Sequence, residues 1–225
     1  MKPLVLALVA AFAVAAATAS QAGAQNECQG IQQCIPVGGP WVYVHGSAET
    51  DFLVSCGSKG VVGGLDALAT STAVRVSFDG RLGAPVAPGT TTTRSVLFRG
   101  RLSGASRGAF QPWVGCIPAS GGGGRSTVSA RVAPGPSLDR VARIVIVSPG
   151  EVKTASIGCP SGEKLIGGWH AIAFRTKNAP TLADADRVRV HHALAGGKVV
   201  ATVASTDALS IDAHAVVQIG AECAP

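Results

Sequence analysis

The sequence predicts an all-β protein made of two tandem homologous antiparallel units, each resembling a β-sandwich and each closed by one disulfide. Short runs of Val, Ile, Thr and aromatic residues alternate with polar residues at a period of two. Gly, Pro, Asp and Ser interrupt these runs about every eight to twelve residues. One stretch of sequence also occurs twice. No window after the first two dozen residues keeps the apolar spacing of an amphipathic helix.

Residues 1–24 have the composition of a signal peptide. Lys2 gives a positive start, the stretch 4–19 is almost wholly apolar, and Ala22-Gly23-Ala24 provides a small-x-small cleavage site. The apolar stretch is short and rich in alanine, which is not typical of a membrane anchor. We therefore expect a secreted, extracellular protein without a transmembrane anchor, whose mature chain begins at Gln25.

The repeat begins with a gap-free match over sixteen residues. "WVYVHGSAETDFLVSC" (41–56) aligns with "IVIVSPGEVKTASIGC" (144–159), and Gly-Gly at 63–64 aligns with 167–168 after one gap. Agreement at a fixed offset of about a hundred residues indicates a duplicated unit. The predicted units span 41–118 and 144–225, with a Gly/Pro-rich connector at 119–143 between them and an N-terminal segment at 25–40.

The ends of the two units also correspond. Phe110, Pro112, Val114 and Cys116 alternate along the first as Val217, Ile219, Ala221 and Cys223 do along the second. This alternation places Gln111 and Gln218 at equivalent, outward-facing positions. Each Gly-Gly pair lies within a strand-like run, where glycine usually marks a β-bulge or a close approach of two backbones.

All six cysteines lie in the mature chain, which predicts disulfides in an oxidising compartment rather than metal ligands. No Cys-x-x-Cys pair is present. If equivalent positions pair alike, the bridges are Cys56–Cys116 and Cys159–Cys223, and Cys28–Cys34 closes a local loop in the N-terminal segment. Six cysteines allow 15 connectivities, and this choice rests on the duplication alone.

The phrase "CPSGEKLIGGW" (159–169), followed by a cysteine near the C-terminus, resembles a small β-domain of exported actinobacterial proteins of unassigned function. The first copy departs from that pattern at Gly57, where the family has proline, and at Leu65, where it has an aromatic residue. A looser similarity links the phrase to egg-coat β-prism proteins and related lectin-like modules. Neither resemblance implies catalytic residues.

The charge of the chain is positive, and most of it comes from arginine. The net charge is +6 for the full sequence, and removal of Lys2 with the signal peptide leaves 6 − 1 = +5. Arg94, Arg99 and Arg101 lie in one predicted hairpin and suit phosphate or carboxylate groups of an anionic cell-wall polymer or glycan. The alternative is that these arginines only keep the protein soluble. Nucleic acid is not an expected partner, because no pattern of interleaved aromatic residues is present.

Among the tryptophans, Trp113 is the expected exposed aromatic residue. It faces away from the alternating apolar positions of its strand, and it is therefore a candidate binding residue together with the arginines. Trp41 and Trp169 align with Ile144 and Leu65, so we expect both in the core.

Four of the five histidines lie in the second unit. His170 and His192 align with Asp66 and Phe78 of the first unit, which is the pattern expected of a site that one copy gained after duplication. His192 is expected at the core or its rim, and the neighbouring His191 faces outward. Zinc needs three or four converging ligands, and the sequence brings together two at most. No metal site and no cofactor is therefore predicted.

Two other patterns suggest catalysis or ligation but have a simpler explanation. Ser106 lies in "GASRG", the spacing of a hydrolase nucleophile, but between β-like runs instead of a strand and a helix. Asp184 and Asp186 lie in an inserted stretch, 175–186, and offer oxygen ligands, but a solvated loop is expected there.

We therefore expect a non-catalytic secreted protein with a binding or structural role at the bacterial cell envelope or in the extracellular space. The alternative is a secreted hydrolase or metal-dependent enzyme, which requires His170, His192 or His214 to converge with an aspartate. A third hypothesis, an inhibitor of foreign enzymes, would use the loop Cys28–Cys34 as a rigid ligand. The sequence leaves the ligand and the oligomeric state open.

Overall fold

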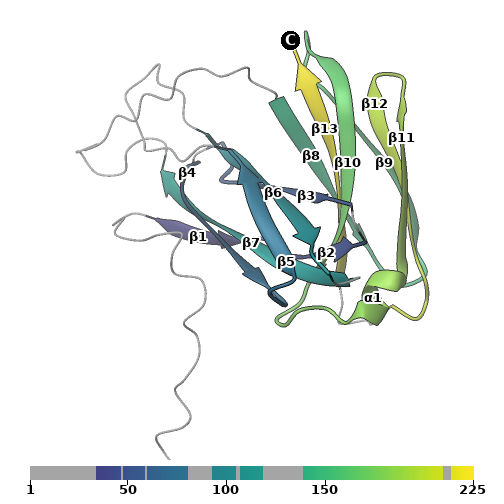
Figure 1. Cartoon of the computed structure of the whole chain (residues 1–225). Coiled ribbons are helices and arrows are strands. Elements are labelled where there is room, and N and C mark those ends of the chain that lie inside the picture. Colours follow the sequence, from purple (N-terminus) through teal and green to yellow (C-terminus); the bar gives the residue numbers. More distant parts are fainter. Residues whose placement is uncertain are drawn as a thin grey trace, which may run out of the picture.

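A computed structural model describes residues 34–46, 48–58, 60–80, 93–104, 107–118, 139–209 and 214–225 (Figure 1). The predicted signal peptide, Cys28, Ser106 and most of the predicted connector lie outside the described residues.

The described chain is built from antiparallel strands, which confirms the all-β prediction. One seven-stranded sheet curls into a half-barrel and has the order β1-β7-β2-β10-β13-β8, with β4 on the other edge of β7. We call it the long sheet. Its strands are β1 (Ile35–Gly38), β2 (Trp41–His45), β4 (Gly60–Ala69), β7 (Arg107–Pro118), β8 (Asp139–Val147), β10 (Lys164–Arg175) and β13 (His214–Ala224).

Two three-stranded sheets accompany the long sheet (Figure 1). The first small sheet has the order β3-β6-β5, with β3 (Thr50–Ser55), β5 (Val74–Asp79) and β6 (Ser95–Leu102). The second small sheet has the order β11-β12-β9, with β9 (Val152–Gly158), β11 (Val188–Ala195) and β12 (Lys198–Ser205).

The strands pair in the same order in the first half of the described chain (β2–β7) and in the second (β8–β13). In the first half β4 pairs with β7, and β7 with β2; in the second, β10 pairs with β13, and β13 with β8. The two halves join where β2 pairs with β10, at Val42↔Ala173 and Trp41↔Phe174. The long sheet is therefore continuous across both halves.

The hydrophobic cores also cross this junction. The core of the first half includes Ala171, Ala173 and Val216 from the second half. The core of the second half in turn includes Tyr43 from β2, whose pKa is raised because its hydroxyl is buried. Since successive side chains of a strand face opposite sides of the sheet, β2, β10 and β13 contribute to both cores.

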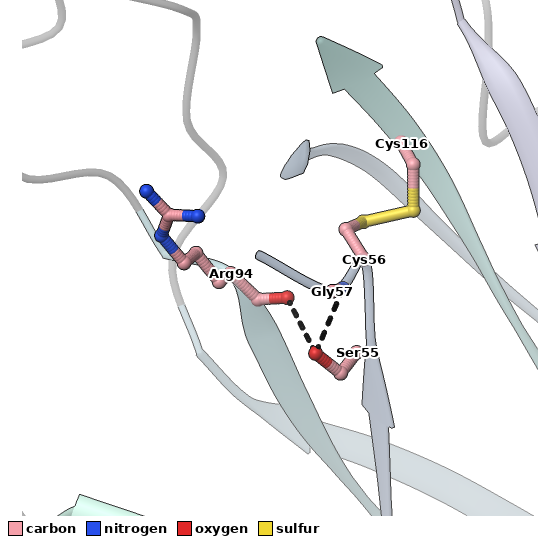
Figure 2. Close-up of a disulfide and its surroundings, with 5 residues drawn as sticks. All are labelled: Ser55, Cys56, Gly57, Arg94 and Cys116. Atoms are coloured by element: carbon pink, nitrogen blue, oxygen red, sulfur yellow. Dashed lines mark hydrogen bonds between the residues drawn. A yellow bond between two sulfur atoms is a disulfide. The ribbon is translucent and has the colours of Figure 1, made fainter. Parts of the chain in front are cut away.

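The two large-loop disulfides are present as predicted. Cys56 is bonded to Cys116 (Figure 2), and Cys159 is bonded to Cys223. Each bridge connects the turn before a long strand, β4 or β10, to the last strand of its half. Cys34 is also disulfide-bonded, and its predicted partner, Cys28, lies outside the described residues.

The repeated Gly-Gly phrase marks an irregular strand in both halves, as predicted. The register shifts between Val62 and Gly64 on β4 and between Leu165 and Gly167 on β10. In the second half a side chain, rather than another backbone, approaches the glycine closely, because a Cβ added at Gly168 would lie 2.5 Å from Val199 Cγ2 of β12. Any side chain at position 168 would push the second small sheet away from β10.

Three expectations need correction. The strand β8 begins at Asp139, inside the predicted connector, so Arg140 and Arg143 belong to a sheet. The inserted stretch contains a short helix, α1 (Leu182–Asp186), because Thr181 caps its first turn and accepts a hydrogen bond from the Asp184 backbone N–H. Helical periodicity cannot reveal so short an element.

The strand pattern predicts that Gln218 faces outward, and this prediction is wrong. Its side chain is buried, since the first small sheet covers this part of β13. Gln218 Oε1 accepts from the Leu53 backbone N–H at 2.6 Å, and Nε2 donates to the Leu53 carbonyl at 2.9 Å. β3 is an edge strand, so the amide satisfies two backbone groups at its open edge.

Candidate functional site

Two histidines from different sheets meet in the second half. His170 on β10 and His192 on β11 approach with 2.6 Å between their Nδ1 atoms. The ring centroids are 4.8 Å apart and the ring planes are inclined by 63°. We call these two residues the histidine pair. At this distance one Nδ1 donates a hydrogen bond and the other accepts it.

The position of the pair follows from the strands that carry it. β11 is an edge strand of the second small sheet, and β10 pairs with β2 only through Ala173 and Phe174. Ile172 and Val190, which flank the pair on the inner side, pack against the second core. On the other side Leu194 is 56% exposed. The pair therefore lies half-buried at the rim of this core.

Burial disfavours the charged form of His170. The pKa of His170 is lowered from 6.5 to about 4, chiefly because burial disfavours the charged ring and also because His192 lies beside it. His170 is therefore neutral near pH 7, and its imidazole nitrogens remain available as hydrogen-bond acceptors or ligands.

The other histidines of the second half do not join the pair. His191 is exposed on the opposite face of β11, as predicted. His214 pairs with Arg175, whereas His170 pairs with Ile219. Five residues of strand therefore separate the two positions by about 17 Å and place their side chains on opposite faces. In the described ranges no three His, Cys, Asp or Glu residues cluster as metal ligands would.

The two aspartates of the inserted stretch have structural contacts. Asp184, expected in a solvated loop, is buried. It accepts a hydrogen bond from Thr181 Oγ1 at 2.6 Å and pairs with Arg187 at 3.2 Å. Asp186 pairs with Arg107 of the first half at 2.7 Å. Neither carboxylate reaches the histidine pair, so the aspartate required by the enzyme hypothesis is not supplied from this stretch.

Two of the three candidate arginines, Arg99 and Arg101, share one face of β6, and Arg94 precedes this strand. Arg99 pairs with Asp51 of β3 at 3.2 Å, and Arg101 pairs with Glu49, which precedes β3. Burial raises the pKa of Asp51 although Arg99 lies beside it. Arg94 is exposed and donates to the Ser58 carbonyl. In Figure 2 its guanidinium points away from the Cys56–Cys116 bridge, while its own carbonyl accepts from Ser55 Oγ.

One of the three tryptophans, Trp113, is less exposed than the strand pattern predicts. Trp113 is half-buried rather than exposed, because its ring lies 2.8 Å from the place that a Cβ at Gly38 would take on the paired strand β1. Its indole N–H is buried without a hydrogen-bond partner. Trp41 and Trp169 are buried, as predicted.

The corresponding positions of the first half hold no such pair. Asp66 Oδ1 accepts a hydrogen bond from the Ala67 backbone N–H, and Phe78 is exposed and packs its ring near Phe98 at 6.3 Å between centroids. The sequence identified His170 and His192 but not the roles of Gly168 and Leu194 beside them. Gly168 shares the His170 face of β10 by its spacing of two, which is the signal available in the sequence.

Within the described ranges, no helix combines the length and the hydropathy that a membrane crossing requires. Comparison with models of known protein families, with characterised proteins and with solved structures finds no match to this chain.

Proposed function

We propose that the chain is an exported, non-catalytic protein with a binding or structural role at the cell envelope or in the extracellular space. The observation that carries this proposal is the pair of disulfides, Cys56–Cys116 and Cys159–Cys223. Such bonds form and persist in oxidising compartments outside the cytosol. They close loops of 60 and 64 residues, which suits a scaffold that must stay folded outside the cell.

We also infer that the two halves descend from one duplicated unit, related to the small exported β-domain that the sequence resembles. The recurrence of the strand pairings and of the disulfide in each half supports this inference. The shared sheet and the exchanged core residues are then later adaptations, which fused two units into one body.

The proposed partner is an anionic wall polymer or glycan, and Arg94 is the arginine best suited to contact it. Arg99 and Arg101 already face carboxylates of this chain, whereas Arg94 is exposed and has only a carbonyl as its partner. Arg94 therefore keeps its charge available for an external anion. Trp113 offers at most part of its ring for stacking on a sugar.

The test is retention of the oxidised mature protein, residues 25–225, on purified cell envelopes at about 50 and about 500 mM salt. We expect retention at low salt that falls at high salt and in Arg94→Gln. The matched control, Arg175→Gln, removes an exposed charge from β10 in the other half and should bind as the wild type does. Retention that resists salt and is lost in Trp113→Ala would instead indicate a sugar platform.

No retention at either salt concentration would refute envelope binding. Equal losses in Arg94→Gln and Arg175→Gln would refute a specific role of Arg94 and leave only general attraction by net charge.

One observation favours the second candidate, a secreted hydrolase or metal-dependent enzyme: His170 and His192 converge. Turnover of ester, peptide or glycoside substrates by the wild type, lost in His170→Ala but kept in His191→Ala, would establish it. His191 is the matched control because it lies on β11 next to His192 but faces the other way.

A further inference from the structure

We infer that the histidine pair is a binding site for a divalent transition metal, with Cu²⁺ as the preferred ion. The ligands are Nδ1 of His170 and Nδ1 of His192, and water or an external ligand completes the coordination. This inference does not depend on envelope binding or on catalysis.

The direction of the two rings favours a shared metal ion. Their Nδ1 atoms face each other at 2.6 Å, so a single proton occupies the space between them. If that proton moves to Nε2 of the same ring, a tautomer of equal charge results, and both Nδ1 lone pairs point at one place. A cation can then take the place that the proton occupied between the two rings.

A metal ion requires only a small adjustment of the histidine pair. With metal–nitrogen bonds of about 2.0–2.1 Å at right-angled to tetrahedral geometry, two ligand nitrogens are about 2.8–3.4 Å apart. The observed separation of 2.6 Å must therefore widen by about 0.2–0.8 Å. Both rings are carried by strands rather than loops and are half-buried, so little conformational entropy is lost on binding.

The close packing of the strands holds the two rings together. Gly168 lies on the same face of β10 as His170, and its missing Cβ lets Val199 and Leu194 of the second small sheet approach closely. β11 is thereby held against β10 at the distance at which the rings meet. The first half has neither histidine at the corresponding positions, and its Phe78 is exposed.

The number of ligands selects the ion. Structural zinc sites use four protein ligands and catalytic ones three, but the described chain supplies two here. Among divalent first-row ions Cu²⁺ binds nitrogen ligands most tightly, and it accepts a tetragonal set of two nitrogens and two oxygens. A two-imidazole site with open positions therefore fits Cu²⁺ better than Zn²⁺.

The experiment is a calorimetric titration of CuCl₂ into tag-free, chelator-treated mature protein, residues 25–225, with disulfides intact, near pH 7. We expect one Cu²⁺ per chain, and electron paramagnetic resonance should show hyperfine coupling to two nitrogens. Zn²⁺ titrated under the same conditions should bind at least tenfold more weakly.

The variants separate this site from adventitious binding. His170→Ala and His192→Ala should each weaken Cu²⁺ binding at least tenfold, and so should His192→Phe, which restores the residue type of the first half and protects the fold. His191→Ala and His214→Ala are the matched controls and should leave the affinity unchanged. Near-ultraviolet circular dichroism of each variant verifies the native fold.

The inference is refuted if the wild type binds no Cu²⁺, or if His192→Phe binds it as tightly as the wild type does. Tighter binding of Zn²⁺ than of Cu²⁺ would refute the choice of ion.

Discussion

Gln218 shows how one side chain can join two sheets. Its amide donates to and accepts from the backbone of Leu53, as a neighbouring strand would. The equivalent Gln111 makes a single hydrogen bond, from Nε2 to the Gly39 carbonyl at 3.0 Å, and is half-buried. The two aligned glutamines thus make different hydrogen bonds, because only Gln218 bonds to a strand of the other half.

Replacement of Gln218 by leucine should therefore cost more than replacement of Gln111. Gln218→Leu leaves the N–H and C=O of Leu53 unpaired, and we expect the free energy of unfolding to fall by about 2–4 kcal/mol. Gln111→Leu should cost about 1 kcal/mol or less. Urea unfolding with the disulfides intact measures both, and equal losses would contradict the structural role given to Gln218.

The histidine pair makes stability depend on pH in a defined direction. Unfolding restores the ordinary pKa of His170, near 6.5, while the folded value is about 4. As the pH falls from 6.5 towards 4, the unfolded chain binds a proton that the folded chain rejects, so the stability present above pH 6.5 decreases. Below about pH 4 this contribution levels off.

In chelator-containing buffer, the wild type should therefore lose about 1–2 kcal/mol more stability than His170→Gln between pH 7 and pH 4.5. This figure is reduced from the full shift because the ring is only partly buried. Chemical unfolding at the two pH values gives the difference. An identical pH dependence in both proteins would show that His170 titrates normally in the folded state.

At the scale of the elements, the bulge in β10 determines which of its residues face the second small sheet. The bulge before Gly167 turns Ile166 outward, where it is 53% exposed. After the bulge, Gly168 lies against β12 and His170 against β11. The Gly-Gly phrase thus sets how closely the second small sheet packs on the long sheet.

Two adjacent glycines offer a matched test of this packing. Gly168→Ala places a methyl group 2.5 Å from Val199 Cγ2 and should lower stability by about 1–3 kcal/mol through overpacking. Gly167→Ala meets only the flexible end of Glu222, at 3.1 Å, and should cost less. Thermal unfolding of both variants decides the order, and a harmless Gly168→Ala would show that the sheets are not closely packed there.

At the scale of the whole molecule, the halves share a sheet and exchange core residues. Tyr43 packs in the second core, and Ala171 and Val216 pack in the first. Separation of the halves would expose these side chains to water. We therefore expect the chain to unfold as one cooperative unit, although its sequence reads as two.

Removal of either large-loop disulfide tests this cooperativity. The double variants Cys56→Ser/Cys116→Ser and Cys159→Ser/Cys223→Ser should each lower stability by about 2–5 kcal/mol. Each should shift a single calorimetric transition of the entire chain. Two transitions, of which only the one in the altered half moves, would show that the halves unfold independently.

The sequence by itself determined the strand-rich fold, the two large-loop disulfides, the irregular Gly-Gly strands and the burial of Trp41 and Trp169. Each of these follows from local periodicity or from the comparison of one copy with the other. These signals are present in the amino-acid sequence itself, and they can be recognised without knowing which strands become neighbours.

Only the tertiary structure decided that β2 pairs with β10, that Gln218 is buried and that His170 meets His192. Alternation along a strand states that a side chain faces one side or the other, but not what covers that side. The sequence pattern of β13 predicts that the face with Gln218 contacts solvent, whereas in the structure the first half of the chain packs on that face. For the same reason the prediction that Trp113 is exposed is wrong. The strand β1 pairs with β7 and lies against the ring of Trp113.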